Sequence, residues 1–484
     1  MDVLTGSVNS MNLDHHGLVA ATCQDLGIAD KINSALGPKH PYRVVSAGTS
    51  VVAMILNGLG FTNRRLYLTP QFFENKPVAR LLGDDIEAAS LTDDTLGKTL
   101  DEIANYGSSK LFGEVAFAVA LEQNLLSDRN HLDTTTLSVQ GAYTQSKRED
   151  GAVPHLTYGH SKDHRPDLKQ VVLSLTVNGP ANLPLWMEAL DGNSSDKANF
   201  HSTIATVQAF QSQVGVSEPF KWVADSALYS KDRLLAQNAY LWLSRVPETL
   251  KEAKTLVNQA ADTLEWTDRG AGYHTARHQS HYGGIEQRWL LVYSQQAYQR
   301  EIKTFERQLD KQEKALANTL MKLSKQVFSC EQDAQNALEP LLKRPGYFTL
   351  TPTVKVLEQY PGRGRPAQGA KKDVVGYQLC VEARRDEGVI QQARNRKGRF
   401  VLATNDLDEQ CCPDEQMLSE YKQQQGVERG FRFLKDPWFM VDSIFLKSPK
   451  RIEALMMVMT LCLLVYNVAQ YRLRKTLRAK DEAS

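Results

Sequence analysis

The chain has 484 residues, of which 42% are hydrophobic and 23% are charged, and its formal net charge is +1. This composition excludes disordered and fibrous proteins, and the length is enough for several domains with a large buried core. Six scattered cysteines are typical of a reducing cytoplasm and not of a disulfide-rich secreted protein. The chain does not open with a basic segment followed by an apolar one, so we expect no secretory signal.

The charges are unevenly distributed along the chain. Residues 1–130 carry ten Lys and Arg against fifteen Asp and Glu, whereas residues 361–400 carry ten against four and residues 443–480 carry eight against one. Clustered positive charge is typical of phosphate contacts. The two later segments are therefore the expected phosphate-binding parts of the chain.

Residues 1–130 are predicted to form a separate helical domain. Thr92 or Asp93 can cap one helix, and Ser108 or Ser109 can begin the next, each followed by apolar residues at helical spacing.

Strand patterns dominate the region that follows, residues 131–247. We predict strands at 131–139, 171–177, 183–189, 220–225 and 240–246, with a helix at 198–213 before the last two. Three strands, a helix and then further strands are the order of an RNase H-like sheet. The expected fold class is therefore α/β, with an RNase H-like mixed sheet as the core.

A large insertion is predicted at residues 248–398, containing a strand at 287–294 and a long helix at 299–327. In that helix Ile302, Leu309, Leu316 and Leu323 recur every seven residues. This spacing suits either a dimeric coiled coil or packing within the same chain, and we favour the second because the other seam position is polar. The core is predicted to return at 399–440, with a strand at 400–405.

A basic C-terminal helical segment is expected at 441–484. Its apolar stretch, 454–468, is shorter than the roughly twenty residues that span a bilayer. We therefore expect a buried helix and no membrane partner.

Three carboxylates stand out because each lies on a different predicted element. Asp133 lies in a strand rich in β-branched residues, Asp225 ends an apolar strand, and Glu428 lies on a late helix. An aspartate in a buried strand is costly unless it meets a cation or several donors, although either aspartate alone could simply cap a turn. Oxygen ligands without a Cys or His set favour Mg²⁺, with Mn²⁺ able to substitute.

The helix of Glu428 carries a predicted polar stripe. Tyr421, Gln424, Glu428 and Lys435 fall within roughly 60° of arc at about 100° per residue, and Arg432 joins them. Val427, Phe431 and Leu434 turn toward an adjoining face that can pack on a core.

These residues resemble the DDE transposases of bacterial insertion sequences, in the subgroup with a Tyr-x2-Arg-x3-Glu-x6-Lys signature. Tyr421, Glu428 and Lys435 match that signature, while Gln424 stands where the family usually has Arg. Asp133 and Asp225 correspond to the first and second acids of the family. The stretch 158–170 resembles the family's entry into the second core strand, and its Lys162 and Arg165 are candidate DNA contacts.

The resemblance implies a transposase that cleaves the ends of an insertion sequence and joins them to target DNA in a Mg²⁺-dependent, cut-and-paste reaction. It implies that Asp133, Asp225 and Glu428 bind the metal and that Tyr421, Gln424, Arg432 and Lys435 contact DNA phosphates. The implied partner is double-stranded DNA, both terminal inverted repeats and target, bound by a homodimer associated with the nucleoid in a bacterial cytoplasm. The helical N-terminal domain would recognise the element's ends or pair protomers.

Two alternatives remain open: a non-catalytic DNA-binding or scaffolding protein on the same fold, and a structure-specific nuclease without strand transfer. The sequence contains no Gly-rich phosphate loop, so we expect no nucleotide cofactor. Arg363 and Arg365, in a Gly-rich segment, fit either a minor-groove hook or an exposed linker.

Overall fold

The computed structural model describes residues 10–38, 43–60, 68–143, 153–217, 219–229, 234, 239–362, 368–436, 439 and 446–480. The chain divides into two compact units. Unit 1 comprises Met1–Arg245, Ser280–Gln287 and Ala403–Ser484, and unit 2 comprises Val246–Gln279 and Arg288–Leu402. The segment 1–130, predicted as a domain of its own, is grouped with the core strands in unit 1, and most of the predicted insertion forms unit 2.

Unit 1 begins with a group of helices. They are α1 (His16–Asp25), α2 (Ile28–Leu36), α3 (Ala47–Gly58), α4 (Thr69–Phe73), α5 (Val78–Leu82), the 3₁₀ turn η2 (Ala88–Ser90), α6 (Asp93–Tyr106) and α7 (Ser108–Glu122). The Thr92 hydroxyl accepts a hydrogen bond from the Thr95 amide and so caps α6, one of the two predicted caps. Helices α2 and α3 pack closely, because a Cβ on Gly48 would lie only 2.1 Å from the Ala29 carbonyl oxygen.

The strands of unit 1 confirm the predicted order of elements. They are β1 (Arg129–Val139), β2 (Lys169–Asn178), β3 (Leu183–Leu190), β4 (Lys221–Ala224) and β5 (Trp242–Arg245), with α8 (Asp196–Gln213) between β3 and β4. In space the order is β3-β2-β1-β4-β5. The pairs β1–β2 and β2–β3 are antiparallel, while β1–β4 and β4–β5 are parallel. The 3₁₀ turn η5 (Tyr282–Gly284) also belongs to this unit.

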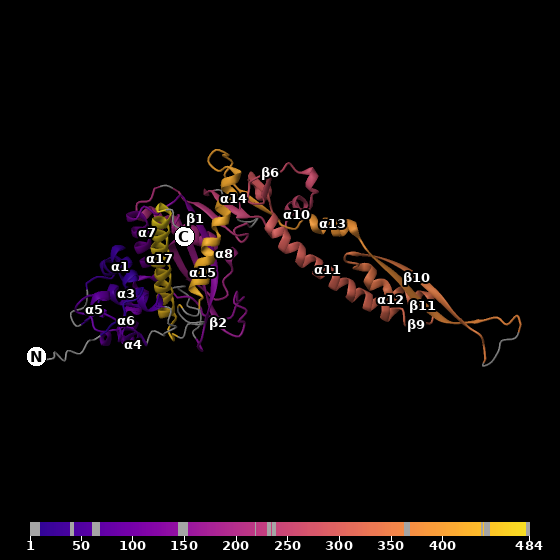
Figure 1. Cartoon of the computed structure of the whole chain (residues 1–484), viewed down its shortest axis with the longest axis horizontal. Coiled ribbons are helices and arrows are strands. Elements are labelled where there is room, and N and C mark those ends of the chain that lie inside the picture. Colours follow the sequence, from indigo (N-terminus) through magenta and orange to yellow (C-terminus); the bar gives the residue numbers. More distant parts are fainter. Residues whose placement is uncertain are drawn as a thin grey trace, which may run out of the picture. The chain divides into compact units, whose positions relative to one another are not determined.

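The late helices of unit 1 are α14 (Asp414–Gln423), α15 (Gln425–Leu434) and α17 (Pro449–Ala479). Helix α17 contacts α1, α3, α6, α7, α15 and β3 and lies among the N-terminal helices in Figure 1. With 31 residues, α17 is the one helix of the described residues that is long and apolar enough to cross a membrane. However, 78% of its most apolar 18-residue stretch is buried within the protein. Such burial is typical of a core helix, as predicted.

Unit 2 has two parts within it. One contains α10 (Lys251–Asn258), η4 (Ala261–Thr263), α13 (Glu387–Asn395) and the strands β6 (Thr267–Asp268), β7 (Tyr273–Ser280), β8 (Gln287–Ser294) and β12 (Arg399–Thr404), in the order β12-β8-β7-β6. The other contains α11 (Gln295–Leu323), α12 (Glu331–Lys343) and a sheet of β9 (Val327–Phe328), β10 (Phe348–Gln359) and β11 (Asp373–Arg385), shown in Figure 1. One or two terminal residues of β7, β8 and β12 belong to unit 1, namely Ser280, Gln287, and Ala403 with Thr404.

The heptad residues of α11 pack inside unit 2. Phe305, Leu309 and Leu320 form a buried cluster with residues of α12, β10 and β11, and the predicted seam residues Ile302, Leu316 and Leu323 pack against it. Packing within the same chain, the favoured alternative, is therefore confirmed.

Candidate active site

Two of the predicted acids are neighbours in the sheet of unit 1. Asp133 lies within β1, and Asp225 directly follows β4. The two strands run parallel with Leu132 paired to Ala224, so each aspartate is the next residue after this pair. Adjacent strands are about 4.8 Å apart, and equivalent register positions face the same side of a sheet. Asp133 and Asp225, both half-buried, therefore lie side by side at one edge of the core.

Backbone amides hold one oxygen of each aspartate. The Thr134 amide donates to Asp133 Oδ1 over 2.7 Å, and the Ala227 amide donates to Asp225 Oδ1 over 2.8 Å. Asp225 therefore also caps the turn after β4, which is the local role open to such an aspartate. These bonds fix the orientation of both carboxylates.

The helix predicted around Glu428 is two helices in the structure. α14 ends at Gln423 and α15 begins at Gln425, and the Val427 amide bonds to the Gln424 carbonyl three residues back, over 3.1 Å. Gln424 is buried, whereas Glu428 is exposed. The backbone of Gln424 stays helical, with φ −51° and ψ −29°, and the Glu428 amide bonds to its carbonyl, so Gln424 differs from the rest of the predicted polar stripe in being buried.

Gln424 ties this junction to β1. Its Nε2 donates to the Leu132 carbonyl over 3.1 Å, and its Oε1 lies 3.2 Å from Nδ1 of His131. Burial lowers the pKa of His131 to about 4, so the ring is neutral at pH 7 and its Nδ1 proton can bond to Gln424. In this structure the partners of the Gln424 amide are thus β1 groups beside Asp133.

A second contact joins α14 to the start of β1. Glu420, which is buried, forms an ion pair with Arg129, the first residue of the strand. Together with the Gln424 contact, it fixes the approach to α15 against the strand that carries Asp133. α15 itself packs against β1, β2 and α17, with Val427, Phe431 and Leu434 buried as predicted.

Tyr421 connects the late helices to the second aspartate. Burial raises the pKa of its phenol; a hydrogen bond and the charge of Arg245 act in the opposite direction, and the charges of Asp225 and Glu428 raise it further. The phenol therefore remains protonated at neutral pH and accepts a hydrogen bond from Arg245. The pKa of Tyr421 therefore responds to the charges of both Asp225 and Glu428.

The segment between β1 and β2 contacts both β1 and the end of α15. Lys162 Nζ donates to the Thr134 carbonyl over 2.6 Å, next to Asp133. Asp163 forms an ion pair of 2.6 Å with Lys435 at the end of α15. Lys435, a predicted phosphate contact, and Lys162, a predicted possible DNA contact, therefore both have partners within the chain.

The remaining predicted DNA contacts differ in their surroundings. Arg165 makes a two-pronged ion pair with Asp167 through Nε and Nη2, at 2.8 and 2.7 Å. Arg432 is exposed in the last turn of α15. Arg363 and Arg365 lie outside the residues that the structure describes.

The donor chemistry of the site suits a hard cation, since all three acids are carboxylates. In the described part of the chain, however, no group of three or more His, Cys, Asp and Glu side chains is gathered closely enough to hold a metal ion. Asp133 and Asp225 are adjacent by register, and Glu428 lies on α15, which packs against β1. Among the described residues, the three acids do not form a set of metal ligands in this structure.

Sequence reasoning missed three side chains of this region: Arg245, His131 and Asp163. Arg245 had a usable signal, because it ends a short apolar strand just as Asp225 does, and the ends of parallel strands meet at one edge. Asp163 and His131 gave no comparable signal, since their partners are 272 and 293 residues away in the sequence.

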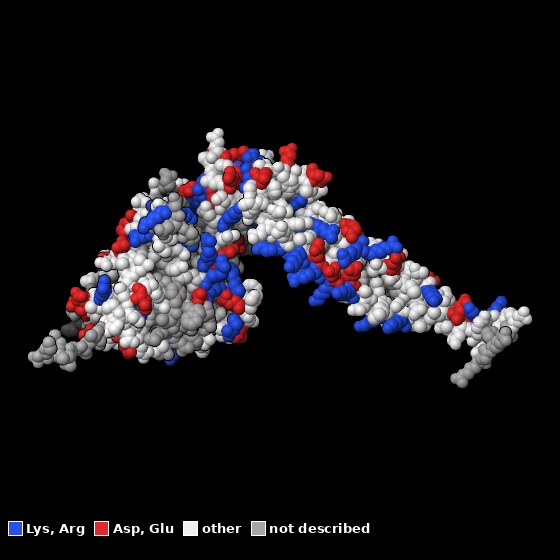
Figure 2. All heavy atoms as spheres, viewed as in Figure 1, with Lys and Arg blue, Asp and Glu red and all other residues white. Residues whose placement is uncertain are grey.

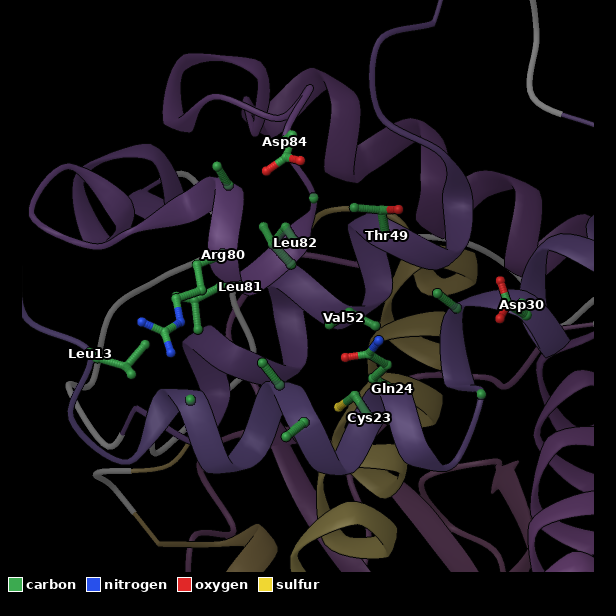
Figure 3. A pocket seen from close by; sticks show the side chains of 17 residues that line it. Leu13, Cys23, Gln24, Asp30, Thr49, Val52, Arg80, Leu81, Leu82 and Asp84 are labelled. Atoms are coloured by element: carbon green, nitrogen blue, oxygen red, sulfur yellow. The ribbon is translucent and has the colours of Figure 1, made fainter.

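A cavity of about 730 Å³ lies elsewhere in unit 1, among the N-terminal helices (Figure 3). Its lining is mainly small and apolar, with the charged side chains of Asp30, Arg80 and Asp84. Burial raises the pKa of Cys23, which also lines it, to about 12, so this thiol is not a nucleophile at neutral pH. None of the three predicted acids lines this cavity.

The chain is similar to known proteins at two levels, one a sequence family and the other a solved structure. Residues 8–117 match a domain of unknown function, DUF4277. The structure is similar to a piggyBac transposase solved by cryo-electron microscopy in a synaptic complex with hairpin DNA, with 10% sequence identity, covering 99% of this chain and 77% of that chain, at a TM-score of 0.38. No curated protein matches the sequence. A similarity at this TM-score carries no argument about activity, so the functional conclusion depends on the site itself.

Proposed function

We propose that this protein is a DDE-type DNA transposase, which cleaves the ends of an insertion sequence and transfers the 3′ ends to target DNA. The observation that carries the proposal is the placement of Asp133 and Asp225 at equivalent positions of the parallel strands β1 and β4. Glu428, the third proposed acid, lies on α15, and α15 packs against β1. The two aspartates are about 90 residues apart in the sequence, so local sequence does not explain why they are neighbours.

The sheet of unit 1 supports an RNase H-like core. Its strand order is β3-β2-β1-β4-β5. The neighbours among β1, β2 and β3 are antiparallel, and β4 and β5 run parallel to β1, which is the arrangement expected for that fold. Asp133 lies on β1, the central strand of this sheet, and Asp225 directly follows the adjacent strand β4. Unit 2 enters between β5 and α14 in the sequence, as an insertion in such a core would.

Asp133, Asp225 and Glu428 would hold Mg²⁺, for which Mn²⁺ can substitute. When bound, the metal would activate first water and then a DNA 3′-hydroxyl for in-line attack and would stabilise the departing oxygen. Arg245 and Tyr421 would position the acids and offset charge near the phosphate that reacts. Lys435 and Arg432, at the end of α15, would neutralise phosphates beside the break. We further propose that a homodimer acts in this way on inverted repeats in a bacterial cytoplasm, without a nucleotide cofactor.

The test uses a supercoiled plasmid that carries the coding region with its natural flanking DNA. The wild-type protein with Mg²⁺ should cut at the ends of the element, and Asp133→Asn, Asp225→Asn and Glu428→Gln should each abolish cutting while retaining DNA binding. Glu415→Gln is the matched control, because Glu415 is an exposed carboxylate on the neighbouring helix α14. Undiminished cleavage by any of the three variants would refute the assignment of that acid.

A second assay separates transposition from the alternatives. Pre-cut element ends and a target plasmid are supplied with Mg²⁺, and joined products are measured. Cleavage without joining would indicate a structure-specific nuclease, and DNA binding without either reaction would indicate a non-catalytic DNA-binding protein.

A further inference from the structure

Helix α11 of unit 2 has two faces of opposite character. Its apolar residues, from Ile302 to Leu323, pack on α12 and the sheet of β10 and β11. At about 100° per residue these side chains fall on one side of the helix, and the opposite side points away from the cluster. That outward side has no structural role in the packing of unit 2.

The outward side is positively charged along its whole length. We define the basic stripe of α11 as the six residues at offsets of zero, three, seven, eleven, fourteen and twenty-two, which fall within roughly 100° of arc opposite the apolar face. They are Arg300, Lys303, Arg307, Lys311, Lys314 and Lys322. All six are exposed, and Figure 2 shows Lys and Arg side chains gathered along the part of unit 2 that Figure 1 labels α11.

The acidic residues of the helix lie outside this arc, and three of them have partners within unit 2. Asp310 and Glu313 both bind Arg385, at 2.8 and 2.6 Å, and Glu301 accepts a hydrogen bond from the Gly398 amide. Within the described ranges, none of the six cations of the stripe forms an ion pair. The carboxylates of α11 are therefore used to stabilise the unit, while its cations are left to solvent.

Such an arrangement opposes the stability of the helix itself. Arg300–Lys303, Lys303–Arg307, Arg307–Lys311 and Lys311–Lys314 are spaced by three or four residues, and like charges at that spacing repel one another on a helix. A merely solvated helix face would mix both signs, which adds favourable pairs at the same spacing. Salt screens this repulsion in part, and a polyanion lying along the stripe would remove it.

The length and composition of the stripe identify the anion. From Arg300 to Lys322 the helix rises about 33 Å, which is close to the 34–36 Å of one turn of duplex DNA. The stripe contains no aromatic residue, and Lys is depleted in the cores of protein interfaces, where Trp and Tyr form the anchors. A regular polyanion fits these features better than a folded protein partner does.

We propose that the basic stripe of α11 binds the sugar-phosphate backbone of duplex DNA over about one helical turn. The choice of DNA among polyanions rests on the proposed function, whereas binding itself requires no catalysis. The contact is sequence-independent, because lysine and arginine contacts to phosphate position a protein without reading bases. It would add a contact between unit 2 and DNA that does not depend on sequence.

The test measures binding of the full-length protein to a fluorescein-labelled 30-base-pair duplex of random sequence, by anisotropy, without divalent metal. The stripe variant carries Lys303→Gln, Arg307→Gln, Lys311→Gln and Lys314→Gln. Removing one cation from a phosphate reduces the slope of log K against log salt by about 0.9, so the slope should become shallower by roughly 3 to 4. At 100 mM salt the affinity should fall by at least about tenfold.

The matched control removes four exposed cations from other surfaces, through Lys98→Gln, Lys110→Gln, Lys343→Gln and Arg384→Gln. It changes the net charge by the same amount but should keep the affinity and the salt slope of the wild-type protein. Circular dichroism of the stripe variant should show unchanged or higher helix content, because repulsion has been removed. Unchanged binding by the stripe variant, or equal losses in both variants, would overturn the proposal. Because the assay contains no divalent metal and measures binding alone, a failure of the catalytic proposal leaves this result readable.

Discussion

The contact between Gln424 and β1 makes a quantitative prediction about the stability of unit 1. Gln424→Ala removes two hydrogen bonds and leaves His131 Nδ1 buried without this partner, while Leu132 stays paired within the sheet. A buried polar group that loses its partner costs about 1–3 kcal/mol and a further hydrogen bond contributes about 0.5–1.5 kcal/mol, so we expect the free energy of unfolding to fall by about 2–4 kcal/mol. Urea denaturation followed by tryptophan fluorescence measures this change. Hydrogen exchange should also become faster in β1 and in α14 and α15.

The neighbouring residue supplies the control for this prediction. Gln425 is exposed at the start of α15, and Gln425→Ala should change the unfolding free energy by less than about 0.5 kcal/mol. If Gln424→Ala is as stable as the wild type, or if both variants are destabilised equally, the tether between α15 and the strand of Asp133 is not what holds them together.

Three further predictions concern burial and packing. Burial lowers the pKa of His131 from 6.5 to about 4, so between these pH values the unfolded chain binds a proton that the folded protein does not. The free energy of unfolding should therefore fall as pH drops from 6.5 to about 4. Urea titrations at stepped pH should show a smaller fall for His131→Asn. Burial raises the pKa of Glu453 from 4.5 to about 7, so ionisation of this carboxyl opposes folding as pH rises through this range. The free energy of unfolding of Glu453→Gln should exceed that of the wild type by about 1–3 kcal/mol at pH 8 and by nothing at pH 4. An equal gain at both pH values would contradict the raised pKa of a buried acid. Gly48→Ala should destabilise unit 1 by about 1–3 kcal/mol because the new Cβ meets the Ala29 carbonyl, whereas Gly388→Ala in α13, with no contact under 3.3 Å, should stabilise its helix; thermal melts of the two variants with the same sign would argue against the close packing of α2 on α3.

The strands and long helices of this protein could be predicted because their signals are local. The alternation of β-branched and apolar residues predicted β1 to β5 within a few residues, and apolar spacing predicted α11 and the buried faces of α15 and α17. The two aspartates followed from the same reasoning, since a carboxylate within or after a buried strand is costly without a purpose. In these cases the physical cause acts over a few neighbouring residues.

The parts that could not be predicted depend on contacts between distant residues. Gln424 was expected on a polar helix face, but it is buried and its amide bonds to His131 and Leu132. Lys435 was expected to contact phosphate, and the sequence did not indicate that Asp163 binds it. The packing of α17, from the other end of the chain, among the N-terminal helices was not predicted either. In each case the deciding partner lies hundreds of residues away, where local spacing carries no information.

The central claim is that Asp133, Asp225 and Glu428 bind the same metal, and iron-directed cleavage tests it most directly. Fe²⁺ replaces Mg²⁺, and ascorbate with hydrogen peroxide generates hydroxyl radicals that cut the polypeptide beside the bound ion. We predict cuts near all three acids, suppressed by excess Mg²⁺ and abolished in Asp133→Asn. Cuts near the two aspartates with none near Glu428, or cuts that persist in Asp133→Asn, would contradict a shared metal site.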